Sequence, residues 1–256
     1  MLESPSGESE LIPLKDNLRA RELPVLVIAL ITINLVVFAL DRISGGYVTY
    51  HIQQGPYIYR QIAFQGGLEQ NYALVPAHLV RHINRYWPTI FTSMFLHANW
   101  LHIGGNMLFL WVFGFSVEEA IGKTRFLILY FVSGIAAALA QVFSNPSSHI
   151  AMIGASGAIA GLMGAYLMLF PGARIYSIVP IFFLGFIMQV PAPILILFWA
   201  FLQYVDAGLM HSPGLGGVAY FAHLGGFSAG IVLIVLMGGR RLGYRLMSRQ
   251  RRYGDH

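Results

Sequence analysis

Long apolar segments constrain this chain more than any other feature of its sequence. They lie near residues 23–40, 94–117, 126–143, 150–170 and 218–238, with a longer apolar region within 175–205. A spanning helix needs about 20 mostly apolar residues, and helices satisfy their own backbone hydrogen bonds in lipid. Charged residues make up only 11% of the chain, against about a quarter in soluble domains. The sequence therefore predicts an all-α polytopic membrane protein with a bundle of six transmembrane helices.

The first and fifth apolar regions each need a separate interpretation. The first is long for a cleavable signal and has no evident small-x-small cleavage site, so we expect a retained helix. The fifth is too long for one span and contains three prolines, which break or kink helices. We expect a short interfacial or re-entrant piece at 175–189, followed by a span at about 191–206.

The basic residues indicate how the helices are oriented. Most of the 16 Lys and Arg residues precede the first span or follow the second, fourth and sixth spans. Cytoplasmic loops are enriched in these residues, so the net charge of +5 reflects membrane orientation rather than nucleic-acid binding. We predict a short cytoplasmic segment at 1–22, a membrane domain at 23–239 and a basic cytoplasmic tail at 240–256. The outer loop 41–93 is expected to lie at the membrane interface like an amphipathic hairpin.

The polar residues inside the apolar segments include one hydroxyl and one imidazole that could work together. Ser156, flanked by Gly154 and Gly157, is six residues into the fourth segment, and His223 is five residues into the sixth. These two segments run in the same direction, so both side chains should lie roughly 8 to 9 Å below the outer ends of their segments. Polar groups at this depth usually serve a functional site. A serine and a histidine at one depth favour acyl transfer by an activated serine.

The neighbouring residues suit the same chemistry. Glycines beside Ser156 predict that the fourth helix begins near the serine, after irregular chain at 150–155 that lines a cavity. Unpaired backbone N–H groups and the positive dipole end at a helix start favour a developing oxyanion. His102 and Asn106 stand at i and i+4, on one face of the second helix.

Small residues would allow the fourth and sixth helices to approach closely. The fourth helix carries Gly157, Gly161 and Gly164, and the sixth carries Gly226 and Gly230. Such small-xxx-small faces let helices pack tightly in lipid. A nucleophile and its base need a separation of about 2.6 to 3.2 Å, and this packing makes that separation possible.

Together these residues resemble the rhomboid family of intramembrane serine proteases. The pattern reads His97-x4-His102-x3-Asn106, then Gly154-x-Ser156-Gly157, then Ala222-His223-x2-Gly226, within about 87–237. The resemblance implies an active site in a water-filled pocket open to the outer side. The fifth span and the loop at about 207–217 would then act as gate and cap.

The resemblance also implies roles for individual residues. Ser156 would be the nucleophile and His223 the general base, in a dyad without an acid. His102, Asn106 and the Ser156 backbone N–H would form the oxyanion hole. The residues expected to support the site are Gly154, Gly157, His97 and Gly226.

Two further positions bear on the resemblance. Glu118 and Gly122 match the family's Glu-x3-Gly pattern, which is structural there. Ala160 stands where some members carry an aromatic residue that packs on the catalytic imidazole. Support for His223 must therefore come from elsewhere in this chain, or be looser.

The same residues also allow other interpretations. Alone, Ser156 could be a small helix-contact residue, His223 a satisfied buried histidine and Asn106 a packing residue. A metal site would have to be built from His97, His102, His149, His211 and Asp206. The chain has no His-Glu-x2-His motif, and metal ligands generally lie closer together in sequence than these five residues, so we expect no metal and no cofactor. A transporter is disfavoured because the confident spans lack an acidic residue.

The sequence thus predicts an intramembrane serine endopeptidase that cleaves transmembrane segments of single-pass membrane proteins. Its partners would be those substrates and the lipid bilayer, and not nucleic acid. We expect it in the bacterial cytoplasmic membrane, with both termini cytoplasmic. The alternative is a non-proteolytic rhomboid-like module that binds transmembrane helices. Loss of Ser156 or His223 would mark such a module, and both are present.

Overall fold

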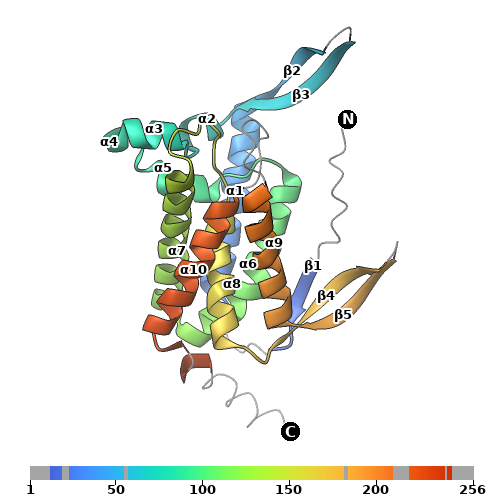
Figure 1. Ribbon diagram of the computed structural model, residues 1–256, viewed down its shortest axis with the longest axis vertical. Coiled ribbons are helices and arrows are strands. Elements are labelled where there is room, and N and C mark those ends of the chain that lie inside the picture. The colour runs from blue at the N-terminus through green and yellow to red at the C-terminus, as the bar shows by residue number, and fades with distance from the viewer. Residues whose placement is uncertain are drawn as a thin grey trace.

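The computed structural model describes residues 12–18, 23–54, 57–181, 184–209, 219–239 and 241–243. Within them, the longer helices that form the bundle are α1 (Val25–Ser44), α6 (Trp100–Ile121), α7 (Lys123–Ser144), α8 (Ser156–Leu169), α9 (Ala192–Leu209) and α10 (Tyr220–Leu236) (Figure 1). Each overlaps one predicted span. By length and composition, α1, α6 and α7 are sufficient to cross a membrane, and α8 to α10 are shorter apolar helices. The predicted polytopic helical fold is confirmed.

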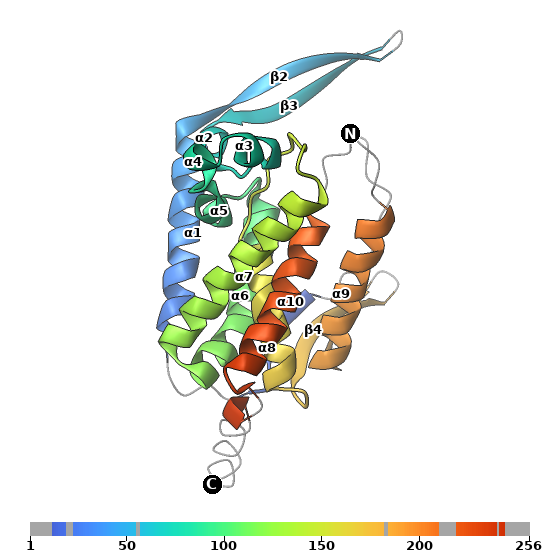
Figure 2. The same cartoon turned by 60° about the vertical axis from the view of Figure 1, so that its left-hand side comes forward.

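Helix α8 is the centre of the bundle. Every residue from 157 to 166 is buried, and the helix packs against α6, α7, α9 and α10. In Figure 2, α7 and α10 lie in front of it. Its side chains are small near Ser156 and larger toward the other end, where Tyr166 contacts the rings of Phe113 and Phe170. Small residues let neighbouring helices come near in lipid, where packing rather than the hydrophobic effect drives association.

Helices α8 and α10 meet backbone to backbone. A Cβ atom added to Gly226 would collide with the carbonyl oxygen of Gly157, and one added to Gly230 would collide with that of Gly161. The close approach expected from these two small-residue faces is therefore present, and it is made by the glycines named in the sequence.

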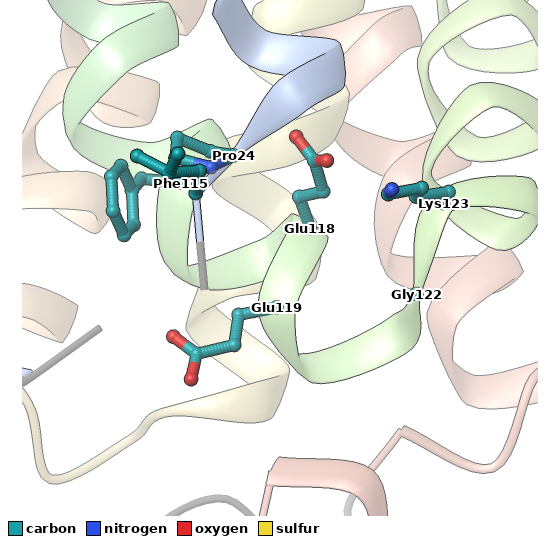
Figure 3. A pocket seen from close by; sticks show the side chains of 7 residues that line it. Pro24, Phe115, Glu118, Glu119, Gly122 and Lys123 are labelled. Carbon is teal, nitrogen blue, oxygen red and sulfur yellow. The ribbon is translucent and has the colours of Figure 1, made fainter. Parts of the chain in front are cut away.

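Glu118 near the end of α6 caps the start of α1. Its two carboxylate oxygens accept the backbone N–H groups of Leu26 and Val27 at 3.0 and 2.9 Å. Glu118 lies beside Pro24 at this junction (Figure 3). Gly122 ends α6 with a positive φ of 78°, which glycine adopts without strain. These contacts give a physical reason for the Glu-x3-Gly pattern, because a carboxylate stabilises the N–H groups and dipole of a helix start.

A small sheet lies at the end of the bundle where α1 begins. Strand β1 (Ile12–Asp16) pairs with β4 (Arg174–Ile181), which pairs with β5 (Leu184–Pro191), all antiparallel. The sequence predicted a short interfacial or re-entrant piece here, and the observed element is a β-hairpin. Its prolines disfavour a helix, and its Ile, Val, Tyr and Phe residues suit strands.

Asp16 fastens this sheet to the bundle. Its Oδ2 accepts hydrogen bonds from the Ser116 hydroxyl at 2.5 Å and the Tyr166 hydroxyl at 3.0 Å. Its Oδ1 accepts the Leu18 N–H at 3.2 Å. Burial raises the pKa of the Asp16 carboxyl above its ordinary value of 3.8, and the hydrogen bonds from Ser116, Tyr166 and Leu18 act in the opposite direction.

The opposite end of the bundle carries the predicted outer loop. Its elements are β2 (Gly45–Gln54), β3 (Tyr57–Gly66), α2 (Glu69–Tyr72), α3 (Pro76–Arg81), α4 (Ile83–Tyr86), α5 (Thr89–Thr92) and the 3-10 helix η1 (Ser93–Phe95). The two strands form an antiparallel hairpin that projects from the bundle (Figures 1 and 2). Asp41 accepts the N–H groups of Leu68 and Glu69 at 2.7 and 3.1 Å, and so holds the base of this hairpin.

Candidate active site

Helix α8 begins at Ser156, and residues 150–155 before it form no regular helix, as predicted. The Gly154 N–H donates to the Ser93 carbonyl at 2.9 Å, which ties this irregular segment to the end of η1. The first bond within α8 runs from Ile159 N–H to the Ala155 carbonyl at 3.0 Å. The Ser156 N–H therefore precedes the helical ladder and is one of the N–H groups that a helix start leaves unpaired.

The Ser156 hydroxyl meets the His223 imidazole. His223 lies in the first turn of α10, and its Nε2 is 2.8 Å from Ser156 Oγ. His223 is buried, whereas Ser156 is partly exposed. The two residues that the sequence placed at one depth are thus within hydrogen-bonding distance, in a geometry that suits a nucleophile and its base.

His102 lies on the other side of Ser156, across Gly154. Its Nδ1 accepts the Ala98 N–H at 3.4 Å, which leaves Nε2 as the protonated nitrogen. Gly154 has a φ of +121°, and a Cβ atom there would lie 2.8 Å from His102 Nε2 and 3.7 Å from Ser156 Oγ. Gly154 is therefore needed for both its backbone conformation and its lack of a side chain. The ring Nε2–H of His102 therefore lies near the side of Ser156 that Gly154 leaves open.

Asn106 is buried one turn after His102 on the same helix face. Its Nδ2 donates to the His102 carbonyl at 3.0 Å, and the Asn99 side chain caps α6 by accepting the His102 N–H at 2.8 Å. An amide nitrogen carries two hydrogens, so one N–H of Asn106 is committed to the α6 backbone and a second remains. His102 and Asn106 are thus held to one helix by backbone contacts.

His97 lies behind His102. Its buried ring meets the His102 ring edge-on, with 5.1 Å between centroids. Its carbonyl accepts a hydrogen bond from Arg42 at 3.3 Å, and Arg42 forms an ion pair with Asp41 at 2.7 Å. This position suits a packing support for His102.

Several residues considered in other roles are found elsewhere. His149 packs against His78, with ring centroids 5.9 Å apart. His211 and most of the predicted cap at 207–217 lie outside the described residues, as does the side chain of Asp206. Among the residues that are described, no group of three or more His, Asp or Glu side chains could hold a metal ion.

Comparison with known proteins identifies the family. Residues 84–240, more than half of the chain, match the family model for the Rhomboid domain. This chain belongs to the rhomboid family. The matched region contains the irregular segment, the start of α8 and the histidine of α10. A rhomboid domain is a polytopic helical bundle, so the protein is an integral membrane protein.

Individual relatives agree with the family assignment. The chain is 34% identical over 148 residues to Rhomboid protein 1, mitochondrial, of Saccharomyces cerevisiae, which covers 56% of this chain and 40% of that protein. It is 34% identical over 145 residues to Rhomboid protease AarA of Providencia stuartii, and the match covers 50% of this chain and 51% of that protein. RHOMBOID-like protein 1 of Arabidopsis thaliana is 29% identical over 223 residues, and the match covers 82% of this chain and 52% of that protein.

This rhomboid-family chain spans about half the length of these relatives or less. Some of the matched relatives are named as proteases, among them Rhomboid protease AarA and Rhomboid protease GluP of Bacillus subtilis, so the family includes proteases. The matched proteins include a mitochondrial one, a chloroplastic one and several bacterial ones.

Two residues that contact His223 were missed from the sequence. Gln203 Oε1 lies 2.5 Å from His223 Nδ1, and the Trp199 ring lies 5.7 Å from the imidazole between centroids. Both belong to α9 and are four residues apart, on one helix face. The sequence did contain a feature that points to Gln203, because it is an uncharged polar residue in an apolar span, like Ser156 and Asn106. These contacts supply the support for His223 that Ala160 does not provide.

Proposed function

We propose that this protein is an intramembrane serine endopeptidase that cleaves transmembrane segments of single-pass membrane proteins. The observation that carries the proposal is the 2.8 Å contact between Ser156 Oγ and His223 Nε2, made between two apolar helices. Family membership supports the same reaction class. A hydroxyl and an imidazole in this arrangement constitute an activated nucleophile.

The reaction begins with proton transfer. Neutral His223 accepts the Ser156 proton at Nε2 while Oγ attacks the carbonyl carbon of the scissile peptide bond. The resulting imidazolium then donates this proton to the leaving amine, and the acyl-enzyme forms. His223 next takes a proton from the water molecule that attacks the ester, and returns it to Ser156 Oγ as the second product leaves. Partial exposure of Ser156 supports access for both the peptide carbonyl and water.

Three groups are proposed to stabilise the oxyanion of the tetrahedral intermediate. They are the Ser156 N–H, the Nε2–H of His102 and the amide of Asn106. Support comes from the start of α8 at Ser156 and from the position of His102 Nε2 beside Gly154. A preorganised donor of this kind contributes about 2.7 to 4 kcal/mol to transition-state stabilisation.

The substrate helix must unwind to bring a carbonyl to Ser156, because helical carbonyls are already hydrogen-bonded. We therefore expect small or helix-breaking residues near the cleaved bond. We further propose that the site opens to the outer side of a bacterial cytoplasmic membrane and that both termini are cytoplasmic. The basic residues that flank the spans support this orientation.

Labelling with a fluorophosphonate probe in detergent tests the proposal. Wild type should be labelled, and Ser156→Ala and His223→Ala should not. A matched control, Ser147→Ala, should behave as wild type, because Ser147 is exposed and its hydroxyl donates to Asn145 rather than to the dyad. Cleavage of a model transmembrane substrate in liposomes should follow the same pattern. The protease proposal would be refuted if all four proteins were labelled equally or if wild type were not labelled. Either result would favour the module that only binds transmembrane helices.

A further inference from the structure

Helix α9 supplies two contacts to the imidazole of His223. Trp199 packs beside the ring, and one turn later Gln203 reaches Nδ1, the nitrogen that does not face Ser156. Gln203 and Trp199 are both partly buried. The imidazole is therefore held from two sides, by α8 through Ser156 and by α9 through Gln203.

The chemistry of this contact fixes where the imidazole proton lies. The Gln203 amide turns its carbonyl oxygen Oε1 toward His223 Nδ1, and in this orientation Nδ1 carries the hydrogen, because a carbonyl oxygen can only accept. A neutral imidazole carries one N–H, so Nε2 is then unprotonated and accepts the Ser156 hydroxyl proton. The opposite tautomer would point an N–H at Ser156 and could not act as its base.

We propose that Gln203 is a positioning residue that holds His223 in the tautomer and orientation required of a general base. This inference rests on the proposed function. Gln203 takes the place that a carboxylate occupies in a Ser-His-Asp triad, but as a neutral acceptor that costs less to bury among apolar helices. It orients the imidazole without stabilising the imidazolium by a full charge.

Helix α9 thereby supports the active site formed by α8 and α10. Helix α9 stands at the side of the bundle, with α10 between it and α7 (Figure 2). Its hydrogen bond to His223 exists only while α9 lies against α10. The tautomer and orientation of His223 therefore depend on the position of α9. Removing this one hydrogen bond leaves the side chains of Ser156 and His223 in place.

Three variants separate positioning from general stability. Gln203→Met keeps the length of the side chain but removes the acceptor, and Gln203→Glu retains an acceptor. Gln141→Met is the matched control, because Gln141 Oε1 accepts the Ala222 N–H at 3.3 Å and so contacts the same helix start without reaching the imidazole. All three are made in the full chain and assayed for cleavage of one transmembrane peptide in detergent.

We expect kcat of Gln203→Met to fall by roughly 10-fold to 100-fold. KM should change less than about 2-fold, because the substitution removes a contact with His223 and none with the substrate. Gln203→Glu should recover kcat to within about 5-fold of wild type, and Gln141→Met should stay within about 2-fold. The proposal is overturned by wild-type kcat in Gln203→Met, by an equal loss in Gln141→Met, or by a failure of Gln203→Glu to exceed Gln203→Met.

A spectroscopic measurement reads the tautomer without turnover. Nitrogen-15 NMR of protein labelled at histidine would be assigned for His223 by the signal lost in His223→Ala, among the nine histidines of the chain. Wild type should show the hydrogen on Nδ1, and Gln203→Met should show a mixture of tautomers. A wild-type hydrogen on Nε2 would overturn the proposal. Wild type that neither cleaves nor labels would refute the protease alone, and this measurement would still decide the tautomer.

Discussion

Gly226 of α10 lies directly against the carbonyl group of Gly157 in α8. Gly157 follows Ser156, and Gly226 is one turn after His223, so this backbone contact lies next to both members of the candidate dyad. The 2.8 Å distance between Ser156 Oγ and His223 Nε2 therefore depends on two glycines that have no reactive side chain.

Replacing Gly226 with alanine should separate α8 from α10. The added Cβ would collide with a backbone carbonyl that cannot rotate away, and overpacking of this kind typically costs about 1 to 3 kcal/mol. We expect a lower unfolding temperature in detergent and a large loss of fluorophosphonate labelling. Gly104→Ala is the control, because a Cβ at Gly104 in helix α6 meets nothing within 4 Å. Wild-type stability and labelling in Gly226→Ala would contradict the packing argument.

The proposed oxyanion donors should affect turnover more than substrate binding. His102→Ala and Asn106→Ala should each lower kcat by about 10²-fold to 10³-fold with little change in KM, because the donors act on charge that exists only in the transition state. Steady-state cleavage of a transmembrane peptide measures both constants. Asn84→Ala, which removes an exposed amide on α4, should leave both unchanged. Full kcat in either donor variant would remove that residue from the oxyanion hole.

Asp16 should make stability depend on pH. Its pKa is raised in the folded protein, chiefly by burial, so the folded state keeps a proton that the unfolded state loses above the ordinary value of 3.8. Stability from this group is then highest at low pH and falls as pH rises through the window between 3.8 and the elevated folded pKa.

Unfolding temperatures in detergent, measured for wild type and Asp16→Asn across this window, check the sign. The decline of wild type with pH should be steeper than that of the variant, which cannot titrate at this position. Burial and the nearby Asp41 also raise the pKa of Glu69, so only the difference between the two proteins isolates Asp16. A variant whose decline matches or exceeds that of wild type would contradict the prediction.

Membrane orientation can be tested directly, because the chain contains no cysteine. Val48→Cys in the β2–β3 hairpin and Thr124→Cys at the start of α7 place single exposed thiols at opposite ends of the bundle. A membrane-impermeant maleimide should label Val48→Cys in intact bacterial cells and Thr124→Cys only after permeabilisation. The reverse pattern would invert the proposed topology.

The positions of the helices could be predicted from the sequence because each depends on its own residues. An apolar segment of sufficient length must become a helix in lipid, whatever surrounds it. The start of α8 at Ser156 was equally local, since Gly154 and Gly157 bracket it. Even the meeting of Ser156 and His223 followed from their depth in two parallel segments and from the glycine faces that join them.

The tertiary structure alone decided which distant segments pair. Strands β4 and β5 formed where a short interfacial or re-entrant piece was predicted, and β1 joined them, because strand pairing depends on residues far apart in the chain. The contact between Gln203 and His223 depends in the same way on how α9 lies against α10. Composition and periodicity determine that a segment spans the membrane and how deep its polar residues lie. Which face it turns to its neighbours is set by the packing of all the helices together.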